Sequence, residues 1–531
     1  MSQKNWILLL AAGLAMSACA SPEDDEELEC DETGKCDSVP ASPCDGIMKD
    51  KSGTNFKRVA GRRNDPLAKA VFREGTTCPK TFKDIMAKLR KNDKENCAGE
   101  LDGIETRLIS ETAQASGKAT SYRSVTTRTC GNRDTDGIIF SLFGIEGSTT
   151  TLPKAVEIIA FDETAGIYNF YETDGTTLNF FGNSKDLLKG PGANDVRRCA
   201  NCHTGGGLIM KELDAPWLHW EGHMDTPGAQ KIVDANKDLG TKADGIELEG
   251  VVKGGNTKWN ATRLAHLKAA GKLQDVLKPL FCTVEVNLDN GADFESPVKG
   301  GRGGDELSGI PFDELLDPQI RSFGSISVDF ADYDAQIKAN GQNLKGVGVT
   351  GAIDTVFDHV FIERSHADNN YVEQARDAKI IDDAFIKDVL MVDFTRPVFS
   401  DDRCGLLSFA PDLTAANMTA KKVRDGFIAN LEAETPVAGS PAAQLLAHLK
   451  ASNDTAAHDA TVDAFVAACT ALGSKPFLQS SLAITSLNRE KARQLPVFEF
   501  ESTMPTDNQS VDADARLHPK TCQVVTQFVA P

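Results

Sequence analysis

Two cysteines and a histidine lie within five residues near the middle of the chain, in the stretch RRCANCHTGGGLIM that begins at Arg197. Residues at positions i, i+3 and i+4 of a helical turn share a face, so Cys199, Cys202 and His203 can meet one planar ligand. The glycines that follow His203 do not favour a longer helix. The fold must therefore bring two thiols and an imidazole together on a short turn.

The N-terminal residues have the pattern of an export signal. MSQKNWILLLAAGLAMSAC places Lys4 before an apolar run from Trp6 to Met16, with small residues just before Cys19. The run is too short to span a bilayer, and the order of charge, apolar run and small residues is typical of secretion signals. We expect residues 1–18 to be a signal peptide; the alternative is a buried N-terminal helix.

An acidic segment follows the apolar run. Between Ser21 and Asp37 nine acidic residues stand against Lys35. Like charges at this density repel one another and keep a segment solvated. We expect residues 19–43 to be a tether.

Cys19 directly after the apolar run resembles the lipobox of bacterial lipoproteins, with Met16 where Leu is usual. The resemblance implies cleavage before Cys19 and acylation of its thiol, and several acyl chains give stable membrane anchoring. The expected location is the periplasm, the outer membrane or the cell surface. Secretion without a lipid, after cleavage nearby, is the alternative.

Export changes the interpretation of the thirteen cysteines, because thiols outside the cytosol tend to pair. Setting aside Cys19, Cys199 and Cys202 leaves an even number, compatible with up to five disulfides. Connectivity does not follow from sequence alone. Short loops suggest three pairs as hypotheses: Cys30 with Cys36, Cys78 with Cys97, and Cys469 with Cys522.

Hydrophobic patterns predict an α+β protein, with antiparallel strands in the N-terminal half and mainly helices around and after the Cys-x-x-Cys-His segment. PKTFKDIMAKLRK spaces its apolar residues along one helical face. Residues 154–182 hold runs of Val, Ile, Phe and Tyr separated by the turn sequences DETAG and ETDG, which predicts an antiparallel meander. Both features fall in an expected α+β region at 44–190.

Helical periodicity dominates beyond the meander. We expect a region around the Cys-x-x-Cys-His segment at 191–295 and a mainly helical region at 296–531, with a boundary near residues 290–308 that overlaps the glycine-rich residues 298–309. The segments with helical spacing are NATRLAHLKAAGKLQDVLKPL, DDAFIKDVLMV, AKKVRDGFIANLEA and DATVDAFVAACTALG.

Cys-x-x-Cys-His is the attachment signature of haem c, and here the chain locally resembles the c-type cytochromes. The resemblance implies one covalent haem c with thioethers to Cys199 and Cys202, and iron bound by His203. It covers the motif and extends loosely to the residues just after it. Nearly 150 residues of body precede the motif and more than 300 follow, so the chain is no bare electron shuttle.

Two other interpretations of the motif stay open. A redox-active or structural disulfide between Cys199 and Cys202 would make the protein a non-haem surface lipoprotein. A structural zinc site needs four ligands, and no second Cys/His pair has the matching spacing.

The sixth iron ligand decides what a haem at this position does. A methionine or a second histidine gives a closed site suited to electron transfer, whereas an open position permits peroxide or oxygen chemistry. Met210 is a candidate because the glycines give the intervening chain freedom to pass the haem edge. Other candidates are His219, His223, Met224, His266, His359, His366 and Met418.

Electron transfer is the leading function predicted from the sequence, with an unknown redox partner protein and a membrane contact through the lipid. The first alternative is a haem enzyme with an open distal site, in which Glu212, His219 or His223 serves as acid or base. The net charge of −20 argues against nucleic acid as a partner and favours a basic protein.

Overall fold

The computed structural model of the protein describes residues 44, 64–72, 77–92, 103–110, 121–129, 137–146, 151–188, 198–201, 203–208, 227–243, 246–289, 310–311, 315–321, 325–329, 332, 335–336, 339, 361–451, 455–493 and 512–531. The chain divides into the units Met1–Pro40 and Ala41–Pro531, and all described residues belong to the second. Three expected features lie outside the described residues: the signal peptide, the tether at 19–43 with Cys19, and the glycine-rich residues 298–309.

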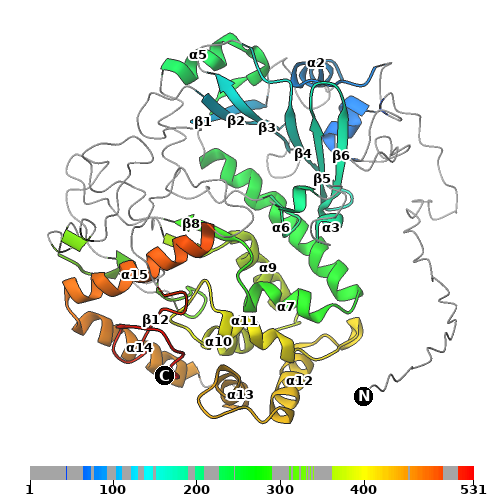
Figure 1. Cartoon of the computed structure of the whole chain (residues 1–531). Coiled ribbons are helices and arrows are strands. Elements are labelled where there is room, and N and C mark those ends of the chain that lie inside the picture. The colour runs from blue at the N-terminus through cyan, green and yellow to red at the C-terminus, as the bar shows by residue number, and fades with distance from the viewer. Residues whose placement is uncertain are drawn as a thin grey trace, which may run out of the picture. The chain divides into compact units, whose positions relative to one another are not determined.

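A seven-stranded sheet dominates the N-terminal half, which confirms the α+β class (Figure 1). Its order is β6-β5-β4-β3-β2-β1-β7, antiparallel throughout except for the parallel pair of β1 and β7. The predicted meander forms its β4–β6 edge. The strands are β1 Ile104–Ser110, β2 Ser121–Thr129, β3 Gly137–Glu146, β4 Val156–Asp162, β5 Ile167–Thr173, β6 Leu178–Asn183 and β7 Thr241–Lys242.

Both predicted turns of the meander are made by an aspartate and a glycine. Asp162 accepts a hydrogen bond from the Ala165 backbone, and Gly166 has φ +65°. Asp174 Oδ1 accepts from the hydroxyl and backbone of Thr176, at 2.6 and 2.7 Å, and these bonds lower the pKa of its carboxyl to about 2. In such Asx turns the aspartate side chain, instead of water, accepts the hydrogen bonds of the backbone N–H groups in the turn of the hairpin.

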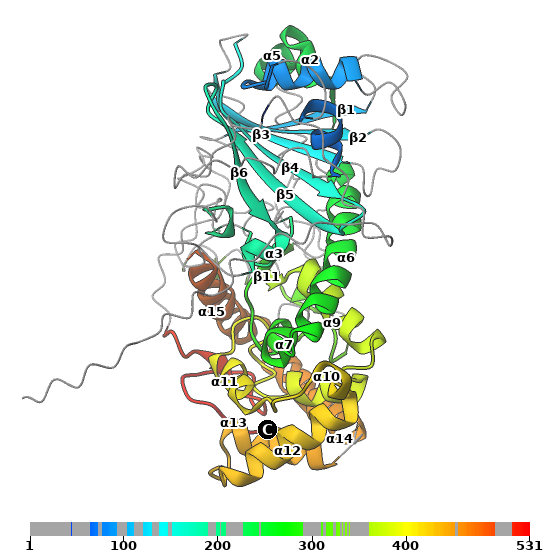
Figure 2. The same cartoon turned by 90° about the vertical axis from the view of Figure 1, so that its right-hand side faces the viewer.

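Helices cover both faces of the sheet. Helix α2, Phe82–Asn92, buries Phe82, Ile85, Met86 and Leu89 on one face, as its spacing predicted. Helix α6, Ile246–Ala269, packs on the other face through Val252 and Trp259, among other residues. In Figure 2 the sheet lies between these two helices.

Two glycines allow α6 to approach the sheet closely. A Cβ on Gly255 of α6 would lie 1.9 Å from the hydroxyl of Tyr168 on β5. A Cβ on Gly166, in the β4–β5 turn, would lie 2.2 Å from Thr262 Oγ1 on α6. Real Cβ atoms do not come so near, so glycine at both positions permits this contact between helix and sheet.

Helices form the rest of the described chain, and the four predicted helical segments are confirmed. The first of them is divided at Gly271, φ +69°, into the end of α6 and helix α7. The helices are η1 Ala68–Phe72, α3 Ser184–Leu187, η2 Arg198–Asn201, α5 Pro227–Ala235, η4 Lys237–Leu239, α7 Leu273–Phe281, α9 His366–Asp377, α10 Asp383–Leu390, α11 Asp401–Gly405, η7 Leu406–Phe409, η8 Ala415–Asn417, α12 Ala420–Ala433, α13 Pro441–Ala451, α14 Thr455–Ala471 and α15 Ser474–Arg493.

Three short two-stranded sheets complete the described strands, and one of them joins segments that are far apart in sequence. In one of them β8 pairs with β11, and β11 leads directly into α9. The strands are β8 Val286–Asp289, β9 Ile310–Pro311, β10 Ser325–Ile326, β11 Phe361–Arg364, β12 Arg516–Leu517 and β13 Val524–Val525. In the described residues, no helix is both long and apolar enough to cross a bilayer.

Three disulfides link described cysteines: Cys44 with Cys78, Cys282 with Cys404, and Cys469 with Cys522. The last confirms a predicted pair. The predicted pair of Cys78 with Cys97 is wrong, because Cys78 bonds Cys44. Helix α2 begins just after Cys78 and its eleven residues carry the chain about 16 Å away before Cys97 is reached. The predicted pair of Cys30 with Cys36 lies outside the described residues.

A glycine pair on α6 tests the packing of this helix on the sheet. Gly255→Ala should lower the free energy of unfolding by about 1–3 kcal/mol, because the new methyl group forces helix and sheet apart. Gly250→Ala in the same helix meets nothing within 4 Å and should raise it by about 0.5–1 kcal/mol through helix propensity. Urea unfolding followed by circular dichroism measures both. Equal effects of the two substitutions would contradict the close contact.

Candidate haem c site

The Cys-x-x-Cys-His segment forms a single turn. Residues Arg198–Asn201 are a 3-10 helix, and the His203 backbone N–H donates to the Cys199 carbonyl at 2.7 Å. This bond spans four residues, so Cys199 and His203 lie on the same face of the turn. Cys199 is half-buried and packs on the core between the sheet and α6. The conformation of Cys202 lies outside the described residues.

The ring of His203 is oriented by one hydrogen bond and one aromatic contact. Its Nδ1 lies 2.8 Å from the Gly207 carbonyl oxygen. A carbonyl can only accept, so Nδ1 carries the proton and Nε2 keeps the lone pair that binds a metal. Phe170 of β5 packs on the ring with centroids 5.0 Å apart. The two ring nitrogens lie on opposite sides of the imidazole, so Nε2 faces away from Gly207.

The glycines after His203 permit the close approach of the loop to its surroundings. Gly206 has φ +75°, and a Cβ there would lie 2.5 Å from the Ser184 carbonyl oxygen. A Cβ on Gly207 would lie 2.6 Å from Asn256 Oδ1. Neither position can hold a side chain without movement of the backbone or of α6.

Helix α6 holds this loop through two buried polar side chains. The Asn256 amide donates to the Leu208 carbonyl at 3.0 Å and accepts from the Leu208 N–H at 2.9 Å. Trp259 donates from Nε1 to the Gly205 carbonyl at 2.8 Å. Backbone groups that would otherwise be buried without partners are thereby satisfied, so residues 205–208 have a defined position on the helix.

A buried polar and charged cluster lies beside the loop. The Arg263 guanidinium stacks over the Tyr371 ring, 4.5 Å from its centroid, and Arg263 Nη1 would lie 3.6 Å from a Cβ on Gly205. Burial raises the pKa of Asp368, and the charge of Arg263 opposes this shift. Thr204 Oγ1, next to His203, is buried and has no hydrogen-bond partner among the residues that the structure describes. A buried hydroxyl normally has one, so a further polar group fits at this place.

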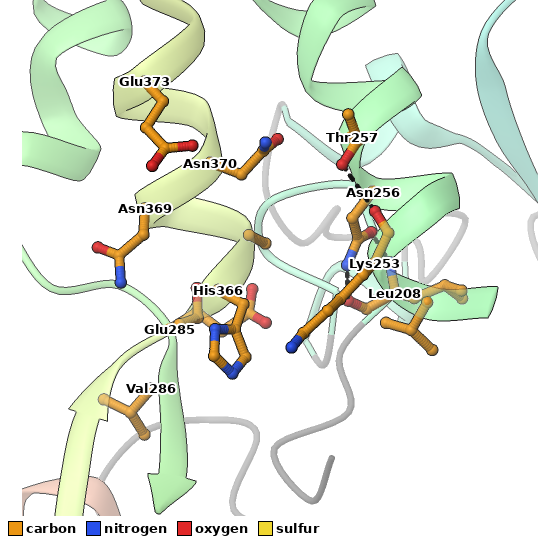
Figure 3. Close-up of a pocket in the computed structure, with 13 residues that line it drawn as sticks. Leu208, Lys253, Asn256, Thr257, Glu285, Val286, His366, Asn369, Asn370 and Glu373 are labelled. Atoms are coloured by element: carbon orange, nitrogen blue, oxygen red, sulfur yellow. Dashed lines mark hydrogen bonds between the residues drawn. The ribbon is translucent and has the colours of Figure 1, made fainter. Parts of the chain in front are cut away.

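The structure places three of the candidate sixth ligands. Met418 is buried in the core of the C-terminal helices, apart from the core that contains Cys199. His266 lies on the exposed face of α6. His366 lines a cavity together with Leu208 and Asn256 (Figure 3), and His203 is not among the described residues that line it. These positions favour none of the three. Met210, His219, His223, Met224 and His359, together with Glu212, lie outside the described residues.

The described residues fit a haem c. Cys199 and His203 share a turn, the Nδ1 proton of His203 is held by a backbone carbonyl as in most metal-binding histidines, and the Thr204 hydroxyl needs a partner. Cys199 and Cys202 would hold the haem covalently, and His203 Nε2 would bind its iron. Within the part of the chain that the structure describes, no three His, Cys, Asp or Glu side chains gather to hold a metal ion.

Sequence reasoning missed three residues: Phe170, which packs on the histidine ring, and Asn256 and Trp259, which hold its loop. Asn256 and Trp259 lie on the buried stripe of α6 that also includes Val252 and Arg263. Asn256 could have been identified from its place on the buried face of a helix, because a polar side chain at such a position needs a specific hydrogen-bond partner. Phe170 is indistinguishable in the sequence from any other core residue of a strand.

Comparison with known proteins shows no relationship. The chain matches no family model, no curated protein and no solved structure.

Removal of the Asn256 amide tests how the loop is held. Asn256→Ala should lower the free energy of unfolding by about 1–3 kcal/mol, because the N–H and C=O of Leu208 lose their partners in a buried place. The amide of Leu208 should also exchange its hydrogen faster, as measured by NMR or mass spectrometry. Thr257→Ala, at the exposed neighbouring position, is the control and should change stability by less than about 0.5 kcal/mol. Unchanged exchange at Leu208 would show that the loop does not depend on Asn256.

Proposed function

We propose that the protein is an exported, lipid-anchored carrier of one covalent haem c, and that it transfers electrons. The Cys-x-x-Cys-His spacing supports the cofactor, and the export signal with Cys19 supports the location. The three disulfides are consistent with an oxidising compartment.

One observation carries the proposal: the 2.8 Å contact between His203 Nδ1 and the Gly207 carbonyl. A histidine whose Nδ1 proton is held by a backbone carbonyl has a fixed tautomer and ring orientation, and it presents Nε2 as a ligand. Phe170 of β5 packs on the same ring, with the centroids 5.0 Å apart.

Each residue of the site has a separate role. The thiols of Cys199 and Cys202 would hold the haem through thioethers to its two vinyl groups, and His203 would bind its iron. The haem, when bound, supplies a one-electron iron couple. Gly207 fixes His203, while Asn256 and Trp259 fix the loop. A site held on rigid elements needs little rearrangement when its charge changes.

The charge of the protein suggests the kind of redox partner. The net charge of −20 gives long-range attraction to a basic surface and faster association at low ionic strength. We therefore expect a basic partner protein whose rate of electron exchange falls as salt is added.

The mass of the mature chain tests for the cofactor. The protein is expressed with export and a haem-attachment system, and its denatured mass and visible spectra are recorded. We expect the added mass of one haem, and none in the variant Cys199→Ala, Cys202→Ala. Asn201→Ala, between the two cysteines, is the matched control and should keep the haem because that position is not a ligand.

Spectra of the loaded protein distinguish the remaining functions. A low-spin spectrum that does not respond to peroxide or carbon monoxide is expected for electron transfer. A high-spin spectrum that responds to either would instead indicate a haem enzyme. The absence of haem, with a disulfide between Cys199 and Cys202, would contradict both and indicate a non-haem lipoprotein.

The lipid anchor is tested at Cys19. Cys19→Ser removes the thiol that would be acylated, so we expect the protein to move from the membrane fraction to the soluble fraction of the exported material. Immunoblotting of the two fractions measures this. Cys30→Ser, in the acidic segment, is the control and should leave the protein with the membrane. Equal distribution of native and Cys19→Ser protein would contradict the anchor.

A further inference from the structure

A buried aspartate connects helix α10 to three other helices near the C-terminus. Asp388 of α10 is 2% exposed, and its carboxylate oxygens accept hydrogen bonds from two different helices. Oδ2 accepts from Arg424 Nη1 of α12 at 2.7 Å, and Oδ1 accepts from His458 Nε2 of α14 at 2.9 Å. The Asp388 backbone carbonyl accepts from His448 Nδ1 of α13 at 3.1 Å. These four residues, the Asp388 cluster, join α10, α12, α13 and α14, which lie together in Figure 1.

The hydrogen bonds of the Asp388 cluster need only one proton on each imidazole. A carbonyl and an ionised carboxylate can only accept, so His448 has its proton at Nδ1 and His458 has its proton at Nε2. The two rings meet edge to face, with centroids 4.7 Å apart and planes at 83°. Neutral rings pack well at this distance, whereas two imidazolium ions would repel each other.

The two histidines differ in what an additional proton would meet. An imidazolium at His458 still has the Asp388 carboxylate as its hydrogen-bond partner. An imidazolium at His448 has only a backbone carbonyl. Burial lowers the pKa of His448 most, and the charge of His458 lowers it further, whereas the bond to the Asp388 carbonyl and the charge of that carboxylate raise it. The closed cluster therefore disfavours a proton on His448.

The neighbouring charges are already paired with one another. Arg424 Nη2 bonds Asp382, at the start of α10, at 3.3 Å. Lys387 of α10 bonds Asp459 of α14 at 2.9 Å. With both histidines protonated, the Asp388 carboxylate would face three cations, from α12, α13 and α14. A buried cation that lacks its own partner strongly destabilises the packing around it.

From this geometry we propose that the Asp388 cluster is an acid-sensitive contact, which holds α13 against α10 and α14 at neutral pH and releases α13 when His448 gains a proton. Release lets the imidazolium reach water and exposes Leu445 and Leu449, which α13 otherwise buries. The pKa of His448 is lower in the closed state than in the open one. The closed state therefore has its full advantage above the ordinary range of histidine and loses it as the pH falls through that range.

Hydrogen exchange of the purified full-length chain, followed by mass spectrometry at pH 7.5 and 5.5, tests the contact. Correction for the intrinsic pH dependence of exchange gives the opening constant of each helix. Uptake of one proton in the open state should raise the opening constant of α13 about five- to tenfold between these values. Helix α2, which packs on the sheet, should not change and serves as the internal reference. An unchanged opening constant of α13 would overturn the proposal.

A substitution that keeps the hydrogen bond but cannot titrate assigns the effect to one ring. In His448→Asn the Nδ2 group can donate to the Asp388 carbonyl in place of Nδ1, and the rise in the opening constant should disappear. His266→Asn, on the exposed face of α6, is the control and should keep the rise. A rise that persists in His448→Asn, as titration of carboxylates would produce, would overturn the proposal.

An NMR titration of the native chain tests the same claim without a substitution. The His448 ring should titrate below the ordinary histidine value of about 6.5. A midpoint at or above this value would overturn the proposal. No step of either experiment needs haem, so failure here would leave the proposed electron transfer unaffected.

Discussion

The paired hydrogen bonds between Asn256 and the backbone of Leu208 connect the fold to the site. Gly255 lets α6 lie directly against Tyr168 of the sheet, and the next residue holds the loop. Gly207 sits against the same asparagine and offers its carbonyl to His203. The contacts thus run from the sheet to α6, from α6 to the loop, and from the loop to the imidazole of His203. The position of each part depends on the part before it.

Helix α6 contacts both the loop after His203 and a cavity. Its buried stripe holds residues 205–208 through Asn256 and Trp259, while Lys253 lines the cavity shared with α9. Asn260 joins α6 to α9 through the Ala367 carbonyl at 2.7 Å.

The sequence alone was sufficient to predict those elements whose structure is decided by the local spacing of apolar residues. The four apolar residues of α2 are buried as predicted, and α12 spans the predicted Ala420–Ala433. It was insufficient for β1 and β2, because polar residues occupy buried positions in these two strands. Thr106 bonds Thr126 at 2.8 Å and Arg107 bonds Thr127 at 2.8 Å, so polar pairs replace the apolar alternation that marks a strand.

Long-range contacts explain the other differences. Cys78 bonds Cys44 rather than the nearer Cys97, since the direction of α2 outweighs loop length. At the site, spacing alone identified Cys199 and His203, but no local pattern shows that Asn256, 53 residues after His203, would hold the adjoining loop. Partners that come together only through the packing of a helix on a sheet need the fold before they can be recognised.

The central claim is that the turn of Cys199 presents His203 Nε2 to the iron of one covalent haem. A crystal structure of the exported protein, with anomalous data at the iron edge, tests it most directly. We predict one iron peak at bonding distance from His203 Nε2, with Nδ1 still bonded to Gly207 and thioethers at Cys199 and Cys202. No iron at this position, together with a disulfide between Cys199 and Cys202, would contradict the account.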